Sequence, residues 1–222
     1  MKLKTSVSTF SAALLKRQWL SDKSFEIILS VPQRFEFHPG QRVRLSLGEL
    51  ERDYSIVSAP GEPQLALCIR SVAGGKLSTL LSVAETGTSV AVSGPYGYFT
   101  YKPSPRPAVF VATGTGIAPF CSMARSGVSG FTLLHGVSLH QDLYYASQLR
   151  QSARRYIPCL TEEKNKLSPD AFQGNVTEYL QQHLTPGDYD FYLSGRSEMI
   201  RDVTLLIDTR FPESLVYTEQ YY

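Results

Sequence analysis

The sequence predicts two domains: an N-terminal antiparallel β-barrel over residues 1–101 and a C-terminal α/β domain with a parallel sheet over residues 107–222. Two patterns predict this division. Large apolar residues recur at every second position in the front half, whereas short apolar runs alternate with helical stretches in the back half. Between the halves, residues 102–107 hold three prolines in five positions, which continue neither a strand nor a helix. We interpret this stretch as an interdomain linker.

The front half has the periodicity of half-buried strands. The clearest period-two runs cover residues 25–31, 43–47 and 65–69. Turn residues separate these runs, at Pro39-Gly40 and at Pro60-Gly61. One helical stretch, residues 77–83, interrupts the strands. Several antiparallel strands with a single helix indicate a small barrel.

The back half alternates strands with helices. The expected strands are residues 108–112, 131–134, 156–160, 190–193 and 215–217. The expected helices are residues 119–125, 143–150, 176–183 and 198–209. This alternation predicts parallel strands joined by crossover helices. By analogy of fold alone, it is an architecture that binds nucleotides.

Composition excludes several classes of protein. The chain has 222 residues, 42% of them hydrophobic and 19% charged, with a net charge of +2, so no basic footprint for a nucleic acid exists. No apolar run approaches the roughly 20 residues of a membrane span. The three cysteines are far apart and form no CxxC motif. They cannot supply the roughly four ligands of an iron–sulfur cluster, and they fit a reducing cytoplasm.

The strongest local motif is the glycine turn at residues 113–119, which follows an apolar strand and opens a helix. Its glycines let the backbone approach a pyrophosphate, and the helix N-terminus offers unpaired N–H groups. Pro119 suits a first helical turn. The third glycine of the usual dinucleotide motif is absent. A tight strand–helix turn without a ligand therefore fits these residues about equally well.

Three further motifs lie in the front half. In Arg52-Asp53-Tyr54-Ser55 the arginine can neutralise a phosphate and the tyrosine can stack on a flat cofactor; a surface arginine beside strand residues is the simpler reading. Residues 74–79 form a glycine turn that opens a helix, which fits a phosphate cradle or an ordinary capped helix. Residues 94–99 form a rigid aromatic turn, for which packing at the domain junction is the favoured reading.

The order of the motifs resembles the ferredoxin–NADP reductase family. The motifs are His38-Pro39-Gly40-Gln41, Arg52-x-Tyr54-Ser55, Gly74-Gly75-Lys76-Leu77-Ser78, Gly94-Pro95-x-Gly97, Gly114-Thr115-Gly116-Ile117-Ala118-Pro119 and Ser194-Gly195-x-x-x-Met199. They span essentially the whole chain. The resemblance implies an FAD-binding barrel, an α/β domain for NADH or NADPH, and an oxidoreductase. Hydride would pass from NAD(P)H to FAD, and single electrons would then pass to a separate ferredoxin or flavodoxin.

The resemblance also implies roles for individual residues of the flavin site. Arg52 would bind the FAD pyrophosphate, Tyr54 would pack against the isoalloxazine ring, and Ser55 would act catalytically near flavin N5. The backbone of the glycine turn and helix start would hold the FAD phosphates, through Gly75, Lys76, Leu77 and Ser78. The C-terminal Tyr222 would stack on the flavin or its adenine.

A second set of residues would hold the nicotinamide nucleotide. The pyrophosphate would lie on the glycine turn, at Thr115, Gly116 and Pro119. Gly195 and Met199 would border the nicotinamide, and Ser194 and Glu219 would be catalytic. Ser194 stands where the family usually has cysteine, so the nicotinamide pose can differ. The four histidines show no metal-ligand spacing and pair with no nucleophile, so we expect none to be catalytic and no metal site.

Two departures bear on substrate and partner. NADPH-using relatives carry arginines where this chain has Ser138, Glu162 and Asn175, which favours NADH; Lys164, Lys166, Arg154 and Arg155 are close in sequence and could compensate. No iron–sulfur domain accompanies the two domains, so the acceptor would be another chain. A dedicated NADH reductase component of a multi-component oxygenase fits the same residues. A regulatory nucleotide-binding subunit without turnover is the non-enzyme alternative.

Overall fold

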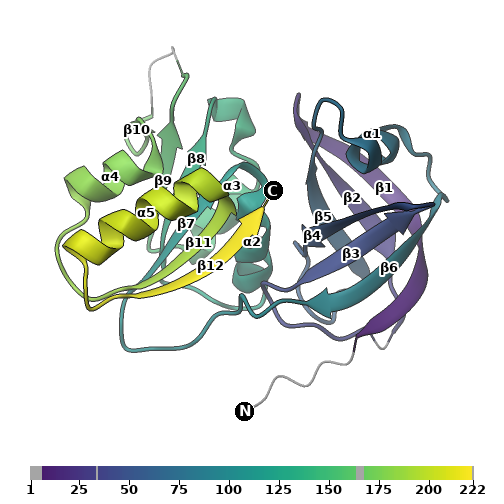
Figure 1. The fold of residues 1–222 in the computed structure, drawn as a ribbon, viewed down its shortest axis with the longest axis horizontal. Helices are drawn as coiled ribbons and strands as arrows, with labels where there is room; N and C mark the ends of the chain where they lie inside the picture. The colour runs from purple at the N-terminus through teal and green to yellow at the C-terminus, as the bar shows by residue number, and fades with distance from the viewer. Residues whose placement is uncertain (1–6, 34, 164–167, 222) are drawn as a thin grey trace. The chain divides into compact units, whose positions relative to one another are not determined.

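The structure is a computed structural model that describes residues 7–33, 35–163 and 168–221. The chain divides into two compact units (Figure 1). The first comprises residues up to 101 together with 118–126, and the second comprises 102–117 together with the residues from 127 onward. Each unit has its own hydrophobic core and is described by itself.

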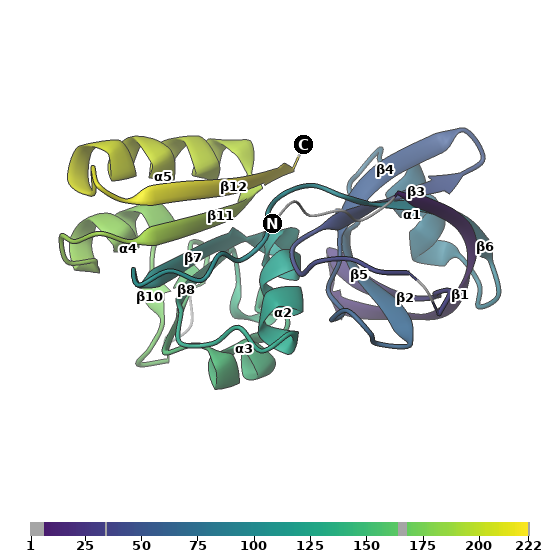
Figure 2. The same ribbon diagram turned by 90° about the horizontal axis from the view of Figure 1, so that it is seen from below.

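The first unit is built on an antiparallel sheet that curves into a barrel (Figure 2). Its strands are β1 (Ser8–Ser21), β2 (Ser24–Ser30), β3 (Arg42–Leu47), β4 (Leu50–Ser55), β5 (Gln64–Arg70) and β6 (Ser89–Tyr96). They lie in the order β4-β3-β6-β1-β2-β5. Ile56, just after β4, forms a bridge to Leu67 of β5 and so connects the two edge strands. The predicted N-terminal barrel is therefore confirmed.

Strand β1 lets the sheet curve because it pairs with different partners along its length. Residues 8–13 pair with β6, and residues 14–21 pair with β2. Register shifts interrupt the pairing with β2, and such irregularities bend a strand and increase its twist. The period-two runs of the sequence coincide with β2, β3 and β5, whose alternate residues point into one core.

Two helices complete the first unit. Helix α1 (Lys76–Val83) lies against β4. Helix α2 (Ala118–Arg125) has seven of its eight residues buried, and the Ser122 hydroxyl donates to the Ser58 carbonyl at 2.7 Å. A Cβ on Gly40 would overlap the Phe99 carbonyl and Met123, so this glycine allows close packing around α2. The expected second domain, residues 107–222, included this helix, whereas the structure groups it with the barrel.

The second unit is a parallel sheet with helices, as predicted. Its strands are β7 (Ala108–Thr113), β8 (Thr132–Val137), β9 (Arg155–Leu160), β10 (Phe172–Gln173), β11 (Asp190–Arg196) and β12 (Leu215–Tyr221). Its α-helices are α3 (Ala146–Ser152), α4 (Val176–His183) and α5 (Ser197–Arg210), of which α4 and α5 share one core with the sheet. The strand order is β10-β9-β8-β7-β11-β12. The chain thus proceeds outward from β7 to β10 and then returns to the other side of β7.

Two details of the second unit differ from the sequence-based expectation. The helix expected at 143–150 begins only at Ala146, because a 3-10 turn, η2 (His140–Asp142), precedes it and Tyr145 adopts a left-handed φ of 61°. The two-residue strand β10 was not expected, since its pairing with β9 is too short to produce a periodic pattern.

Candidate functional site

The glycine turn of the second unit is packed directly against the end of a neighbouring strand. It forms a 3-10 turn, η1 (Gly114–Ile117), after β7. A Cβ on Gly116 would overlap the Ser194 carbonyl and lie 2.8 Å from the Cα of Gly195. Gly195 has a φ of +139°, and a Cβ there would overlap the Thr113 hydroxyl. Both glycines are therefore required for this close approach of two backbone segments.

This contact lies where the direction of the sheet reverses. Strands β7 and β11 are neighbours, and the chain leaves β7 on one side and reaches β11 from the other. In open parallel sheets, ligands bind at the carboxyl ends of the strands beside such a reversal. The turn at residues 114–117 and the segment 194–196 occupy these ends, and the Arg196 N–H donates to the Thr113 hydroxyl at 3.1 Å.

Ser194 carries a polar atom with no hydrogen-bond partner at this reversal. Its side chain is fully buried, and its Oγ is unpaired among the residues that the structure describes. The strand register places Ser194 between Ala112 of β7 and Glu219 of β12. Glu219 is also buried, with 7% of its surface exposed. The structure therefore brings the two expected catalytic residues of this unit to adjacent positions.

The other residues expected at the nicotinamide nucleotide differ in burial. Thr115 is half-buried in the turn. Met199, in the first turn of α5, is buried in the core that this helix shares with the sheet. Pro119 is the second residue of α2 and is buried. Tyr222 lies outside the described residues.

Strand β4 of the first unit presents Arg52 and Tyr54 on one face. Their cross-strand partners are Leu45 and Val43, which both point into the barrel core. Tyr54 packs against this core, and burial raises the pKa of its hydroxyl to about 12 despite the opposing charge of Arg52. Arg52 is exposed. Ser55 is buried, and strand alternation turns it toward the opposite face.

The opposite face of this hairpin carries an ion-pair cluster that the sequence did not reveal. Asp53 accepts from Arg42 at 3.1 Å and from Arg44 at 2.7 Å. Burial alone would raise the pKa of the Asp53 carboxyl, but the hydrogen bonds and charges of the two arginines lower it. The pairing of β3 with β4 brings these three residues together, which explains why their sequence positions gave no signal.

The start of α1 has an open helix N-terminus. Its N-cap residue is Gly75, which has no side chain to accept from the first-turn N–H groups. Such unpaired N–H groups together with the helix dipole form an anion site. A Cβ on Gly75 would lie 2.7 Å from the Ser78 hydroxyl and 3.0 Å from the Val72 carbonyl, so a larger residue would fit this turn only if these neighbours shifted. The hydroxyls of Ser78 and Thr79 both donate to the Gly75 carbonyl and leave the N–H groups unfilled.

Lys76 and Leu77 complete this turn. Lys76 is exposed at the first helical position, whereas Leu77 is buried and anchors the helix in the barrel core. Helix α1, which begins at this turn, packs beside β4, the strand that carries Arg52. A cation, an aromatic ring and unpaired backbone N–H groups are what a flavin dinucleotide requires, so the residues fit FAD.

The aromatic turn at residues 94–99 is mainly a packing element. Gln41 donates to the Gly97 carbonyl at 3.0 Å, and the rings of Phe99 and Phe120 lie 5.8 Å apart within the first unit. Tyr98 is the exception, because 84% of its surface is exposed. The favoured packing interpretation therefore agrees with Phe99 and leaves Tyr98 without a packing role.

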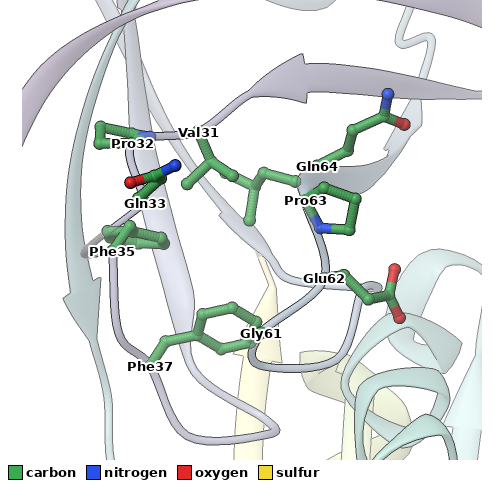
Figure 3. A pocket seen from close by; sticks show the side chains of 10 residues that line it. Val31, Pro32, Gln33, Phe35, Phe37, Gly61, Glu62, Pro63 and Gln64 are labelled. Atoms are coloured by element: carbon green, nitrogen blue, oxygen red, sulfur yellow. The ribbon is translucent and has the colours of Figure 1, made fainter.

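A cavity of about 310 Å³ lies elsewhere in the first unit, between the loop after β2 and the loop before β5 (Figure 3). Its lining is largely apolar, with Phe35 and Phe37 on one side and Pro63 on the other. No residue predicted for either cofactor lines it. Within the described ranges, no group of His, Cys, Asp and Glu could hold a metal ion, and no helix is long and apolar enough to span a membrane.

Two family models match the chain. One, an oxidoreductase FAD-binding domain, matches residues 12–101, and the other, an oxidoreductase NAD-binding domain, matches residues 110–204. The chain belongs to the ferredoxin–NADP reductase family. The expected FAD-binding and NAD-binding domains are confirmed with this membership.

The curated relatives of the chain include proteins named as electron-transfer components and reductases. It is similar to ferredoxin–NADP reductase B of Sorangium cellulosum, 40% identical over 131 residues that make up 54% of each protein. It is also similar to the toluate 1,2-dioxygenase electron transfer component of Pseudomonas putida, 31% identical over 92% of this chain and 65% of that protein. The chain thus spans between about half and two thirds of these relatives' length.

Solved structures share the fold. A ferredoxin NADP+ reductase from Neisseria gonorrhoeae with bound FAD and NADP has a TM-score of 0.81 at 24% identity, covering 95% of this chain and 98% of that one. A cytochrome P450 reductase from Amycolatopsis has a TM-score of 0.86 at 23% identity, covering 99% of this chain and 71% of that one. These neighbours confirm the predicted combination of barrel and parallel sheet.

The buried His135 predicts a pH-dependent stability. Its Nδ1 lies 2.8 Å from the Tyr156 hydroxyl, and burial lowers the pKa of its ring from 6.5 to about 3. Between these values the unfolded chain binds a proton that the folded chain does not, so stability is full above pH 6.5 and falls as the pH decreases. We expect this group alone to remove roughly 2 kcal/mol between pH 7 and pH 5.

Urea unfolding at both pH values measures this effect. His135→Gln should lose that part of the pH dependence, whereas His140→Gln, at an exposed histidine, should retain it. Equal pH dependence in wild type and His135→Gln would contradict the assignment. His135 itself is fully buried in the second unit.

Proposed function

We propose that the chain is a flavin-dependent reductase that takes a hydride from NADH or NADPH onto FAD and passes the electrons singly to a separate protein. In this proposal residues 1–101 form the FAD-binding domain and residues 107–222 form the NAD(P)-binding domain. The main support for this proposal is a feature that the two domains share. Each matched family domain contains a glycine turn of the kind that a pyrophosphate needs, at Gly75 in one unit and at Gly116 in the other.

The barrel residues would hold FAD. Arg52 would neutralise the pyrophosphate, and the first-turn N–H groups at Lys76, Leu77 and Ser78 would donate to it. Tyr54 would cover the isoalloxazine ring with its own ring, which the barrel core holds in place. Ser55 would contribute a hydroxyl near N5. Bound FAD supplies the chemistry that converts a two-electron donor into a one-electron source.

The sheet residues would hold the nicotinamide nucleotide. Thr115, Gly116 and Pro119 would hold its pyrophosphate, and Gly195 would border the nicotinamide. The unpaired Ser194 hydroxyl would bond the nicotinamide end, and the neighbouring Glu219 would help to orient it and exclude water. Met199 would support this region from the core. Tyr222 would cover a cofactor ring from the C-terminus.

The acceptor in this proposal is a ferredoxin, a flavodoxin or the terminal component of an oxygenase. The names of the curated relatives, which include dioxygenase and monooxygenase electron transfer components, favour an acceptor of this kind. Two equipped cofactor sites weigh against a purely regulatory subunit. We place the reaction in the cytoplasm, in keeping with three buried cysteines that form no disulfide among the described residues.

Acceptor stoichiometry tests the proposal. The protein reconstituted with FAD should oxidise NADH or NADPH and reduce about two equivalents of ferricyanide for each nucleotide, because each nucleotide gives two electrons and ferricyanide accepts one. A colourless protein that cannot be reconstituted with FAD would overturn the proposal and revive the regulatory alternative.

The role of Arg52 leads to a more specific prediction. Arg52→Ala should weaken FAD binding by about 10- to 100-fold, since a charge-assisted hydrogen bond contributes roughly 1.5–3 kcal/mol. Fluorescence titration of the apoprotein with FAD measures the dissociation constant. Lys16→Ala removes another exposed cation from the barrel and should leave it unchanged. Equal affinity of the Arg52 variant and wild type would exclude the proposed phosphate contact.

A further inference from the structure

The segments that follow β8 and β9 lie at the same carboxyl edge of the second sheet as the glycine turn after β7. The ladder between these strands continues past their ends, because the Thr161 N–H donates to the Val137 carbonyl at 3.2 Å and the Glu162 N–H donates to the Ser138 carbonyl at 2.9 Å. Ser138 and Glu162 are therefore held side by side. Since β7, β8 and β9 are neighbours, Glu162 lies about two strand spacings, roughly 10 Å, from the turn at Gly114.

This edge is where the adenosine half of a dinucleotide would lie. With the pyrophosphate on the turn after β7 and the nicotinamide at Ser194 on β11, the remaining half extends the other way, across β8 and β9. In dinucleotide-binding sheets, a carboxylate at this end bonds the ribose hydroxyls of NAD, whereas an arginine accommodates the 2′-phosphate of NADP.

The described side chains at this edge are neutral or acidic. Residues 138–142 and 161–163, which follow β8 and β9, include no lysine or arginine. Glu162 is exposed, and a Glu163 oxygen accepts from the His140 N–H at 3.1 Å. The Asn175 side chain is engaged in the N-cap of α4, where it accepts from the Glu178 N–H.

The arginines that could have compensated lie at the wrong end of β9. Arg154 and Arg155 precede or begin this strand, whereas Glu162 follows its last residue. Glu162 lies seven positions beyond Arg155 along extended chain, a span of about 23 Å. The side chain of Arg155 donates to the Tyr179 hydroxyl at 2.9 Å. The sequence-based suggestion that these two arginines offset Glu162 is therefore wrong. Lys164 and Lys166 lie outside the described residues.

We infer that the nucleotide site selects NADH over NADPH, with Glu162 as the specificity-determining residue. This inference rests on the proposed function. Glu162 accepts a hydrogen bond from the adenosine ribose hydroxyls and repels the dianionic 2′-phosphate of NADPH. The neighbouring Ser138 is uncharged and cannot neutralise that phosphate.

Steady-state kinetics and direct binding test the inference together. The FAD-reconstituted wild type should use NADH with at least about tenfold higher kcat/KM than NADPH, a factor that a single charge repulsion supplies. Glu162→Arg should shift this ratio toward NADPH by about tenfold or more, mainly through the KM for NADPH. In calorimetry, the wild type should bind AMP more tightly than adenosine 2′,5′-bisphosphate, and the variant should reverse the order.

Glu213→Arg is the matched control, because it makes the same charge change on an exposed loop before β12, at the other edge of the sheet. It should keep the wild-type preference. A wild type that prefers NADPH, or a Glu162 variant that behaves like the Glu213 variant, would overturn the inference. If Glu162→Arg fails to fold, Ser138→Arg should shift the kcat/KM ratio toward NADPH in its place. The order in which the wild type binds AMP and adenosine 2′,5′-bisphosphate then also tests the inference. A protein reduced by neither nucleotide would instead contradict the proposed function.

Discussion

Replacing Gly116 with alanine is expected to slow reduction of the flavin by NAD(P)H severely and to destabilise the second unit. The added Cβ would overlap the Ser194 carbonyl and approach the Cα of Gly195 to 2.8 Å. Both obstacles are backbone, so the strand end and the turn must move apart. Overpacking of this kind costs about 1–3 kcal/mol, and the displaced turn can no longer cradle a pyrophosphate.

Urea unfolding and stopped-flow flavin reduction measure the two effects. We expect the rate of reduction to fall by at least about 100-fold, because small misplacements at a reacting pair have effects of that size. Gly187→Ala is the control, since its Cβ would meet only the Tyr189 side chain at an ordinary 3.4 Å. A Gly116 variant with normal reduction would show that this turn does not hold the nucleotide.

Replacing Ser194 with alanine is expected to separate activity from stability. The Ser194 hydroxyl is fully buried and has no partner among the described residues, which is unfavourable in the folded protein unless a ligand bonds to it. Removing it should leave the free energy of unfolding unchanged or raise it by up to about 1–3 kcal/mol. The same change should slow flavin reduction by about 10- to 100-fold, because a hydrogen bond to the nicotinamide end is lost.

Ser122→Ala provides the stability contrast. Ser122 is equally buried, but its hydroxyl donates to the Ser58 carbonyl at 2.7 Å, so its loss should cost about 1 kcal/mol. If Ser194→Ala destabilises the protein as much as Ser122→Ala does, the Ser194 hydroxyl has a structural partner and its proposed role is wrong. The pair of variants thus distinguishes a hydroxyl that forms a hydrogen bond only with a bound ligand from one that forms a hydrogen bond within the protein core.

The sequence was sufficient for the fold because its two periodicities are strong and local. The period-two runs became β2, β3 and β5, and the strand–helix alternation became the parallel sheet. The same reasoning could not place features that depend on pairing across the sheet. The neighbourhood of Ser194 and Glu219 follows from the register of β11 with β12, which no local pattern encodes.

Two features of the proposed flavin site could not be predicted from the sequence, because they depend on the geometry of strand β4 and on its contact with α1. Arg52, Tyr54 and Ser55 appear as one motif in the sequence, yet strand alternation places Ser55 on the face opposite Tyr54. The contact of α1 with β4, which joins two separate motifs, was not visible either. The individual site residues therefore stay predictions for mutagenesis, whereas the two domains and their family are established.

Anaerobic single-turnover reduction shows whether hydride passes from a nicotinamide nucleotide to the bound flavin. The purified protein is loaded with FAD, mixed with NADH deuterated at the transferred position of C4 or with unlabelled NADH, and the flavin absorbance is followed. We predict complete bleaching that slows with deuterated NADH, because the transferred hydride comes from C4 of the nicotinamide. Tight FAD binding without bleaching by either NADH or NADPH would contradict it.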